Sequence, residues 1–583
     1  MEVLRDPAAT MAEVLGALTT LDKADHTGPK VKLGIAANIT VDLLADYLRR
    51  HAYLAGVRLE VVKGSYDDLL NNVVNFVEQE IDHVLVIPFF DNLHVAWESQ
   101  VDVLPADARA APMMAWLSEL KLALDQAATV GSVTLAGTHL WNSVSYGITG
   151  EAVLEFNRAL MDLANARANT RYFDTAGIVL RVGEKDAFDP RFYYTGKAPY
   201  APAFFDEFAR RFALSTRGFG SYFYKVVVLD CDNTLWGGII GEDGLSGIAL
   251  DPYDYPGNVY WVVQQQLRQL ESQGILLCLC SKNNPADAEE VFERHPNAVL
   301  SEEHFAAKKL NWDPKPANLK ALAHELNLGL DSFIFIDDSE FELAAVRAQL
   351  PQVRTFQVPK KLTNFPGLIS GVMEICLAGG ISSESKGKTR QYQNLAVAAA
   401  AEDEFASHED YLRSLRLKVR IHRDARQHIT RIAELTQKSN QFNLTTRRYS
   451  PGDITALMER PDATVYSFEV SDRFGDYGIT GVIVLDLATE DAKVDAFLMS
   501  CRVIGRGVEF AVWPAVLTDL KKQGKRGLSA TYLPSAKNKQ VSDFFDRLGL
   551  SKTEESHERG HQYYAEANGD HLKESDWVEL IDG

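Results

Sequence analysis

Cysteine is scarce in this chain, and long apolar runs are absent. Five of the 583 residues are cysteine, an odd number without the spacing of a metal-binding pair. This argues against a disulfide framework or a paired-cysteine zinc module, and we expect reduced thiols in a cytoplasmic protein. No stretch is apolar for long enough to cross a bilayer, and the N-terminus lacks the basic region and apolar core of a signal peptide, so we expect no membrane partner. The cysteines are Cys231, Cys278, Cys280, Cys376 and Cys501.

The chain also lacks an excess of positive charge. It has 60 lysines and arginines against 80 aspartates and glutamates, for a formal net charge of −20. A chain this acidic is not expected to bind nucleic acid nonspecifically, because both carry negative charge. Its 583 residues exceed what one hydrophobic core holds, which predicts three or four domains.

The apolar pattern predicts three α/β domains. In residues 1–215, strands alternate with helices, which is typical of a doubly wound parallel sheet. A second α/β domain follows in residues 220–376. Residues 377–410 change from Gly- and Ser-containing to Ala-rich sequence and are interpreted as a linker. Residues 411–583 predict an α+β domain. The predicted strands are residues 31–38, 57–64, 83–90, 132–137, 225–229, 275–280, 333–336, 417–422, 463–470, 478–485, 493–499 and 526–532.

The most informative stretch is VVVLDCDNT, residues 226–234. An apolar run that ends in acids is typical of a buried parallel strand, and the carboxyl edge of such a sheet is where ligands bind. Asp230 and Asp232 are close enough to share a cation, and one could attack while the other transfers a proton. An acidic pair alone can also simply cap a turn.

Three later segments follow predicted strands or begin helices, and each adds a polar or charged residue that could act together with the acidic pair. They contain Ser281, Lys315 and the pair Asp337–Asp338. With residues 230–234, they resemble the four motifs of the haloacid dehalogenase (HAD) superfamily.

The HAD resemblance implies a phosphoryl site with a Mg²⁺ ion. Asp230 would be the nucleophile or a metal-holding carboxylate. Asp232 would be the general acid/base, with its backbone carbonyl on the ion, and Thr234 would orient it. The remaining roles are a phosphate donor for Ser281, charge neutralisation at the phosphate for Lys315, and completion of the metal site for Asp337 and Asp338.

The spacing after the first motif leaves little room for a cap domain. Residues 236–244 read WGGIIGEDG and are followed by a single predicted helix. An uncapped site is open, which suits a macromolecular substrate or a carrier arm. Cys231 lies between the two acids and has two interpretations. It could be a small core residue, since neighbouring strand positions face opposite ways, or a thiol that takes an acyl group.

Longer motifs resemble the FkbH-like proteins. They are residues 229–244 (LDCDNTLWGGIIGEDG), 281–284 (SKNN), 311–318 (NWDPKPAN), 335–342 (FIDDSEFE), 437–449, 472–482 and 500–509. The resemblance implies removal of phosphate from 1,3-bisphosphoglycerate, a phosphorylated three-carbon acyl donor. The glyceryl group would then load onto the phosphopantetheine thiol of a holo acyl carrier protein, in polyketide or related metabolism. It also makes Cys231 a candidate for the thioester-forming residue, beside its interpretation as a core residue.

Two other functions stay open: a HAD-type phosphatase that forms an aspartyl-phosphate on Asp230, and a noncatalytic scaffold that docks carrier proteins. The intact set of acids, serine and lysine argues against the scaffold.

The flanking domains resemble two other families. Residues 502–507 (RVIGRG) fit the RxxGxG turn of GNAT acyltransferases, and the sequence around Asn538 is similar to the last part of that fold. The pantetheine- or carrier-binding residues so implied are Arg502, Gly505, Arg506, Gly507 and Asn538. The N-terminal domain is similar to SGNH hydrolases or flavodoxin-like proteins. Its first turn reads AAN at residues 36–38, without the expected serine, so we expect it to be noncatalytic.

Overall fold

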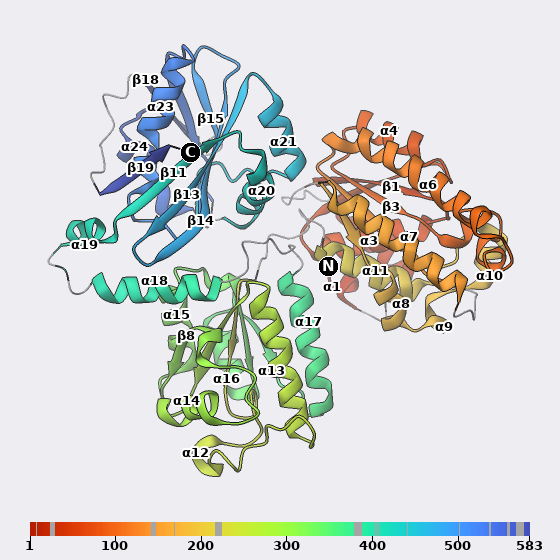
Figure 1. The fold of residues 1–583 in the computed structure, drawn as a ribbon, viewed down its shortest axis with the longest axis horizontal. Coiled ribbons are helices and arrows are strands. Elements are labelled where there is room, and N and C mark those ends of the chain that lie inside the picture. The colour runs from red at the N-terminus through yellow and green to blue at the C-terminus, as the bar shows by residue number, and fades with distance from the viewer. Residues whose placement is uncertain are drawn as a thin grey trace. The chain divides into compact units, whose positions relative to one another are not determined.

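The computed structural model contains three separate sheets (Figure 1). It divides into two compact units, Met1–Ser221 with Tyr449–Ala456, and Tyr222–Arg448 with Leu457–Gly583. Among the described residues, no helix combines the length and the apolar character needed to cross a bilayer. The structure describes all residues except 7–8, 24–29, 142–146, 168, 216–223, 378–387, 403–404, 406, 440, 501, 536–537, 557–559, 567–576 and 583; Cys501 is thus outside the described residues.

The first unit is built on a parallel sheet in the order β2-β1-β3-β4-β5. This is the strand order of flavodoxin-like folds, and it confirms the predicted parallel sheet. The strands are β1 (Lys30–Ala37), β2 (Arg58–Lys63), β3 (His83–Ile87), β4 (Ser132–Ala136) and β5 (Thr170–Phe173). The longer helices are α2 (Met11–Lys23), α3 (Asp42–Leu54), α4 (Leu69–Glu78), α6 (Ala106–Gln126), α7 (Ile148–Asn165) and α11 (Pro202–Ser215).

Helices cover both faces of this first sheet (Figure 1). Alternate strand residues enter two hydrophobic clusters, because neighbouring side chains of a strand face opposite ways. Leu85 packs in the cluster that includes Phe208 of α11, and Val86 packs in the one that includes Phe156 of α7. The sheet is therefore buried on both faces, as its apolar strands predict.

The middle domain has a second parallel sheet, in the order β10-β9-β6-β7-β8. Numbered within the domain, this is the 3-2-1-4-5 order of Rossmann-like folds read from the other edge, with β6 at the centre. The strands are β6 (Val226–Leu229), β7 (Leu276–Ser281), β8 (Phe305–Leu310), β9 (Phe333–Asp337) and β10 (Arg354–Gln357). The helices are α12 (Ile240–Asp243), α13 (Gly257–Ser272), α14 (Pro285–Arg294), α15 (Lys315–Glu325), α16 (Glu340–Gln349) and α17 (Phe365–Leu377).

The segment interpreted as a linker, residues 377–410, contains a packed helix. Of this segment, residues 378–387, 403–404 and 406 lie outside the described residues. Helix α18 (Lys388–Glu402) places Tyr392 in a hydrophobic cluster of the middle sheet. Gln393 of the same helix donates to the backbone oxygen of Phe305 at 2.9 Å. The Ala-rich segment is thus part of a helix, and the start of that helix packs against the middle domain.

The last sheet is mixed, as predicted for an α+β domain. Eight strands follow the order β17-β18-β16-β15-β14-β13-β11-β19, and β12 pairs with β15 off this path. The strands are β11 (Leu417–Arg423), β12 (Phe442–Asn443), β13 (Ala463–Asp472), β14 (Gly475–Asp486), β15 (Ala492–Met499), β16 (Gly527–Tyr532), β17 (Ser551–Ser556), β18 (Gly560–Glu566) and β19 (Val578–Asp582). The longer helices are α19 (His408–Leu415), α20 (Ile429–Lys438), α21 (Pro451–Glu459) and α23 (Trp513–Lys522).

Candidate active site at the carboxyl edge of the middle sheet

The predicted site residues come together because three neighbouring parallel strands end side by side. Strand β6 lies between β7 and β9. Asp230 follows β6 directly, Ser281 ends β7 and Asp337 ends β9. Lys315 begins α15 and reaches the same place. The carboxyl ends of all three strands thus meet at one edge, which is the usual ligand position of such sheets.

Lys315 lies between two buried carboxylates. Its ammonium nitrogen is 2.5 Å from Oδ1 of Asp230 and 2.5 Å from Oδ2 of Asp337. Asp337 is 0% exposed, and its Oδ1 accepts from the backbone N–H of Ser339 at 2.8 Å. Burial alone would lower the pKa of the Lys315 ammonium, but the two carboxylates raise it. The lysine is therefore a fixed positive charge at the centre of the cluster.

Asp230 has a pKa near neutral pH, so its charge depends on the groups around it. The pKa of Asp230 is raised to about 7, because burial and the charge of Asp337 together outweigh the lowering effect of Lys315. Ser281 is also buried and forms a hydrogen bond that lowers the pKa of Asp230. The protonation of a carboxyl group with such a pKa changes when a cation or an anion binds beside it.

Three carboxylates form a set that fits a hard divalent cation. One oxygen from each of Asp230, Asp337 and Asp338 lies within 4.8 Å of the others. Asp338 is half-buried, and burial followed by the charge of Asp337 raises its pKa. Oxygen donors of this kind are what Mg²⁺ prefers. The side chain of Asp232 is outside this set, so its expected contribution to the ion is limited to its backbone carbonyl.

Asp232 is instead held by three N–H donors. Its Oδ1 accepts from the indole of Trp236 at 2.9 Å and from the backbone of Ile240 at 3.0 Å. Its Oδ2 accepts from the side-chain amide of Asn283 at 2.9 Å. The same amide group lies 3.2 Å from Oγ of Ser281. Sequence reasoning missed Asn283, although it lies two residues after Ser281 in the quoted SKNN motif.

The role expected of Thr234 is not supported. Its hydroxyl is fully buried and has no hydrogen-bond partner, so it does not orient Asp232. The orienting role belongs to Trp236, Ile240 and Asn283. The physical reason is the tight turn after β6, in which the backbone N–H of Thr234 folds back onto the carbonyl of Cys231 at 3.1 Å.

Cys231 packs into the hydrophobic core. It is 0% exposed and belongs to the same cluster as Leu229, Leu235 and Trp236. Burial, and after it the carboxylate of Asp230, raise the pKa of the Cys231 thiol, although a hydrogen bond with Ser281 opposes this. In this structure Cys231 is therefore a core residue. Its hydrogen bond with Ser281 also places the thiol next to the candidate site.

The site has no large cap. All residues from 224 to 377 are described, and between β6 and α13 they contain only the short helix α12. The loop turns at Asn233, whose φ of 54° is left-handed, and Gly238 (φ 96°) follows. The side-chain oxygen of Asn233 accepts from the N–H of Gly238 at 3.0 Å. The short loop agrees with the sequence-based expectation of an open site.

The RxxGxG turn lies where predicted, after β15 and before the short helix α22 (Val508–Ala511), but its side chains are engaged internally. Arg506 forms an ion pair with Asp472 at 2.7 Å. Gly505 and Gly507 have positive φ, and Trp577 donates its indole N–H to the carbonyl of Arg506 at 3.1 Å. Arg502 donates to Ser500 at 3.1 Å. The turn is thus stabilised without a ligand.

Asn538 differs from its expected role. It is 0% exposed, and its side-chain amide donates to the backbone oxygens of Asn443 and Leu533, each at 2.9 Å. Its Oδ1 accepts from the backbone N–H of Ser535 at 2.7 Å. Both amide hydrogens are used within the fold, so the side chain has no donor left for a pantetheine arm.

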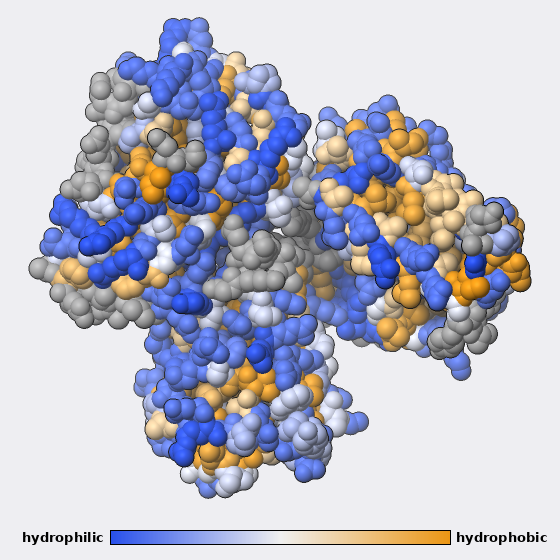
Figure 2. Space-filling model, in the orientation of Figure 1, coloured by the Kyte–Doolittle hydropathy of each residue, from blue (hydrophilic) through white to orange (hydrophobic). Residues whose placement is uncertain are grey.

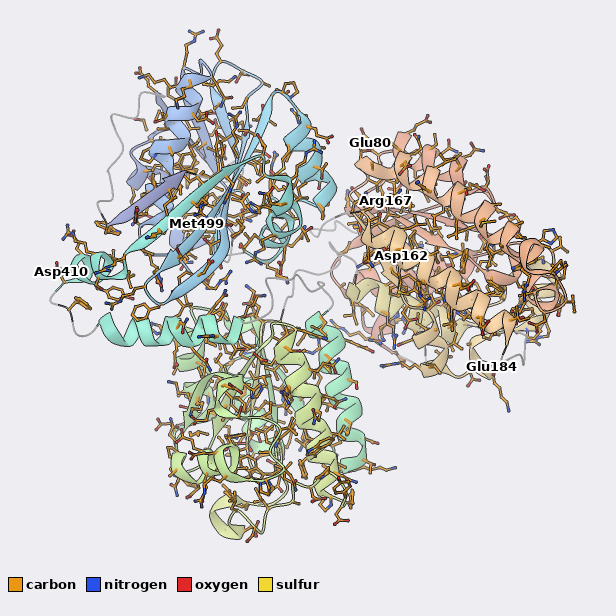
Figure 3. All side chains as sticks on the ribbon, in the orientation of Figure 1. Glu80, Asp162, Arg167, Glu184, Asp410 and Met499 are labelled. Atoms are coloured by element: carbon orange, nitrogen blue, oxygen red, sulfur yellow. The ribbon has the colours of Figure 1, made fainter. Side chains whose placement is uncertain are left out.

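Strands β15 and β16 separate beyond their first residues, and another segment of the chain lies between them. Strands β15 and β16 are parallel and pair only through Ala492 and Lys493 of β15. Farther along, β12 pairs with the end of β15 at Met499, the residue labelled in Figure 3. On the other side, the N–H of Leu533 donates to the carbonyl of Leu444 at 2.8 Å. The backbone after Phe442 thus occupies the gap beside β15.

No protein-family model matches the chain, and no curated protein matches it. Among solved structures, the N-terminal part of the protein BF1531 from Bacteroides fragilis, which contains a phosphatase domain complexed with Mg, matches with a TM-score of 0.55. The identity is 23%, over 61% of this chain and 96% of that chain. The likeness is one of fold.

Acetyltransferases match a smaller part of the chain. The paia N-acetyltransferase from Thermoplasma acidophilum, in complex with coenzyme A, has a TM-score of 0.21 and 12% identity, over 25% of this chain and 98% of that chain. The ribosomal-protein-S18-alanine N-acetyltransferase from Escherichia coli has a TM-score of 0.20 and 10% identity, over 27% of this chain and 97% of that chain. Scores this low support no inference.

Proposed function

We propose that this protein is a Mg²⁺-dependent enzyme that transfers a glyceryl-type acyl group from an acyl phosphate to a thiol. The donor would be 1,3-bisphosphoglycerate, the acceptor the phosphopantetheine thiol of a holo acyl carrier protein, and inorganic phosphate would leave. The observation that carries the proposal is the buried cluster of Lys315 with Asp230 and Asp337, beside Ser281 and Asp232.

The donor atoms of the cluster fit Mg²⁺. Asp230, Asp337 and Asp338 offer carboxylate oxygens within 4.8 Å of one another, and the backbone carbonyl of Asp232 would add a fourth oxygen. When bound, the ion would offset the negative charge of the phosphoryl oxygens. The structural neighbour from Bacteroides fragilis, complexed with Mg, supports this assignment.

The protein's own groups have separate roles in the proposed reaction. Lys315 offsets the negative charge that builds on the departing phosphate, and Ser281 donates a hydrogen bond to a phosphoryl oxygen. Asp232 transfers a proton, and Asn283 fixes its direction. All four groups are held by the fold before the substrate arrives, which reduces the entropic cost of reaching the transition state.

The family resemblance also assigns the first acyl acceptor to Cys231. In that step the sulfur would attack the acyl carbon, the bond from that carbon to the phosphate oxygen would break, and the thiol proton would leave with the inorganic phosphate. The carrier thiol would then attack the enzyme thioester, and its proton would pass to the sulfur of Cys231. The buried, high-pKa thiol of this structure opposes the attack. The step therefore requires that acyl-phosphate binding exposes Cys231 and that a nearby cation lowers the pKa of its thiol.

An apolar rim supports a protein as the acceptor. Five exposed hydrophobic side chains come from loops or helix starts that follow β6, β8 and β9, so they surround the carboxyl edge. Figure 2 shows apolar surface at the end of the middle domain that carries α12. Contiguous exposed apolar surface often marks an interaction site. The five are Ile239, Tyr253, Tyr255, Trp312 and Phe341.

A phosphatase is the second candidate, and the burial of Cys231 favours it. Asp230 would attack the phosphoryl group, Asp232 would protonate the leaving oxygen, and water would release phosphate from the aspartyl-phosphate. This route needs no thiol. The two functions use the same cluster but differ in the attacking group and in where the acyl group goes.

Intact mass of the carrier distinguishes these functions. The full chain is incubated with Mg²⁺, 1,3-bisphosphoglycerate and holo carrier protein. Transferase activity predicts a carrier heavier by one glyceryl group. If the adduct disappears with Cys231→Ala but persists with Cys278→Ala, the thioester route is supported. Phosphate release without any adduct would instead establish the phosphatase.

A further inference from the structure

Two histidines and a glutamate meet on one face of the C-terminal sheet, far along the chain from the acidic cluster. Strands β11 and β13 are antiparallel, with His422 opposite Ser467 and Arg420 opposite Glu469. Side chains two residues apart on a strand share a face, so all four lie on the same side. His428 reaches this face from the short turn Arg426–His428, which leads into α20.

The three side chains have the spacing of metal ligands. Nε2 of His422 lies 3.5 Å from Oε2 of Glu469, and Nε2 of His428 lies 4.0 Å from Oε1 of the same carboxylate. One ligand atom from each residue lies within 4.8 Å of the others. Ligand atoms of a tetrahedral Zn²⁺ site are about 3.3 Å apart at ordinary Zn–N and Zn–O lengths, so only small side-chain shifts are needed.

The surroundings also resemble those of a ligand set. Nδ1 of His428 lies 3.1 Å from the hydroxyl of Ser467, which leaves Nε2 to face Glu469. Such an outer partner is what usually orients a metal-binding imidazole. Nε2 of His422 is buried without a hydrogen-bond partner, and a metal ion would satisfy it. Arg420 lies 3.4 Å from Glu469 and holds that carboxylate near the pair.

We propose that His422, His428 and Glu469 form a second metal site, for Zn²⁺ or a similar transition-metal ion. Imidazole nitrogens suit Zn²⁺ and not Mg²⁺, so this site and the acidic cluster select different ions. The ion would join β11, β13 and the start of α20. Its role is structural: it fixes the start of α20 against the two strands.

Metal titration of the tag-free full chain tests the site. The protein is stripped with a chelator and kept in excess Mg²⁺, which occupies the oxygen ligands of the acidic cluster. Zn²⁺ is then titrated by calorimetry, and Co²⁺ is added separately as a spectroscopic probe. We expect one Zn²⁺ equivalent, the strong visible absorption of tetrahedral Co²⁺, and a higher melting temperature with Zn²⁺.

Variants decide where the ion binds. His428→Gln and Glu469→Gln should each lose the equivalent, and Ser467→Ala should bind roughly tenfold more weakly. The matched control is His324→Gln on the exposed side of α15, which should bind as the wild type does. Absence of a Zn²⁺ equivalent in wild type, or its retention in both His428→Gln and Glu469→Gln, would overturn the proposal.

Discussion

The ammonium of Lys315 lies 2.5 Å from a carboxylate oxygen of Asp230, and the side chains are only 4% and 8% exposed. A buried ion pair of this kind gains little net stability, because desolvation offsets the attraction. We therefore attribute the pair to ligand binding and not to stability, because Asp230 can hold a cation and Lys315 can hold a phosphate. This relationship supports the phosphate- and cation-binding part of the proposed function.

Replacing Lys315 should destabilise the fold as well as abolish activity. Lys315→Met leaves Asp230 and Asp337 buried without a compensating charge, which should cost about 3 kcal/mol of unfolding free energy. Urea unfolding measures this, and Mg²⁺ should restore part of the loss because it binds the same carboxylates. The control is Lys320→Met, an exposed lysine of the same helix. Equal stability of the two variants would contradict the central position of Lys315.

The affinity for Mg²⁺ should fall as the pH is lowered through about 7. Burial raises the pKa of Asp230 to about 7, and only the carboxylate form binds the ion. Below that pH we expect the dissociation constant to rise about tenfold per pH unit, as followed by calorimetry. An affinity that stays constant down to about pH 5 would contradict it.

The same pKa has an opposite consequence for stability. Because the pKa of Asp230 is higher in the folded state than in the unfolded state, the folded state binds the proton more tightly. The contribution of this group to stability is therefore complete below its ordinary pKa of 3.8 and is lost as the pH rises to about 7. Asp230→Asn should flatten the pH dependence of urea unfolding in metal-free protein over that range.

Asn283 should act by positioning Asp232. Asn283→Ala removes the donor 2.9 Å from Asp232, which should lower kcat about tenfold with little change in KM and should shift the pH profile of kcat. The matched control is Asn284→Ala, the next residue, whose amide bonds to Asp287 on the exposed side of α14. A variant that raises only KM would show that Asn283 binds substrate instead.

Cys231 should resist alkylation in the free protein. The thiol is fully buried and its pKa is raised, whereas alkylating reagents attack an exposed thiolate. Iodoacetamide labelling followed by peptide mass spectrometry should give a rate at least ~100-fold below that of a free thiol. Acceleration by Mg²⁺ and the acyl phosphate would support the thioester route, while rapid labelling of free protein would contradict the burial.

Much of the fold was predictable from local pattern. The strands that carry the site are continuous apolar runs, and VVVL of β6 is entirely buried. Most of the missed strands are short or lie at sheet edges, although β18 has seven residues and lies between β17 and β16. β10 (RTFQ) has four residues, and β8 (FAAKKL) has two lysines before its last residue, which the pattern predicts to be on the surface. An edge strand is hydrogen-bonded to a single neighbouring strand, and the local sequence does not show which strand that is.

The site residues were predictable where a motif placed them at strand ends, and less so where their roles depend on tertiary contacts. Ser281, Lys315 and Asp337 converge as expected, whereas Thr234 turns into the core and Asn283 takes the orienting role. Asn538 illustrates the same limit. Its bonds to Asn443 and Leu533 depend on how a distant strand fills the gap beside β15, which no local pattern indicates.

The most direct test of the middle site is Mg²⁺-dependent release of inorganic phosphate from 1,3-bisphosphoglycerate by the full chain, compared with Asp230→Asn. The control is Asp331→Asn, before the opposite end of β9. We predict release that requires Mg²⁺, falls at least about 100-fold in Asp230→Asn and is unchanged in Asp331→Asn. Release that is independent of Mg²⁺, or that survives in Asp230→Asn, would contradict the proposed site.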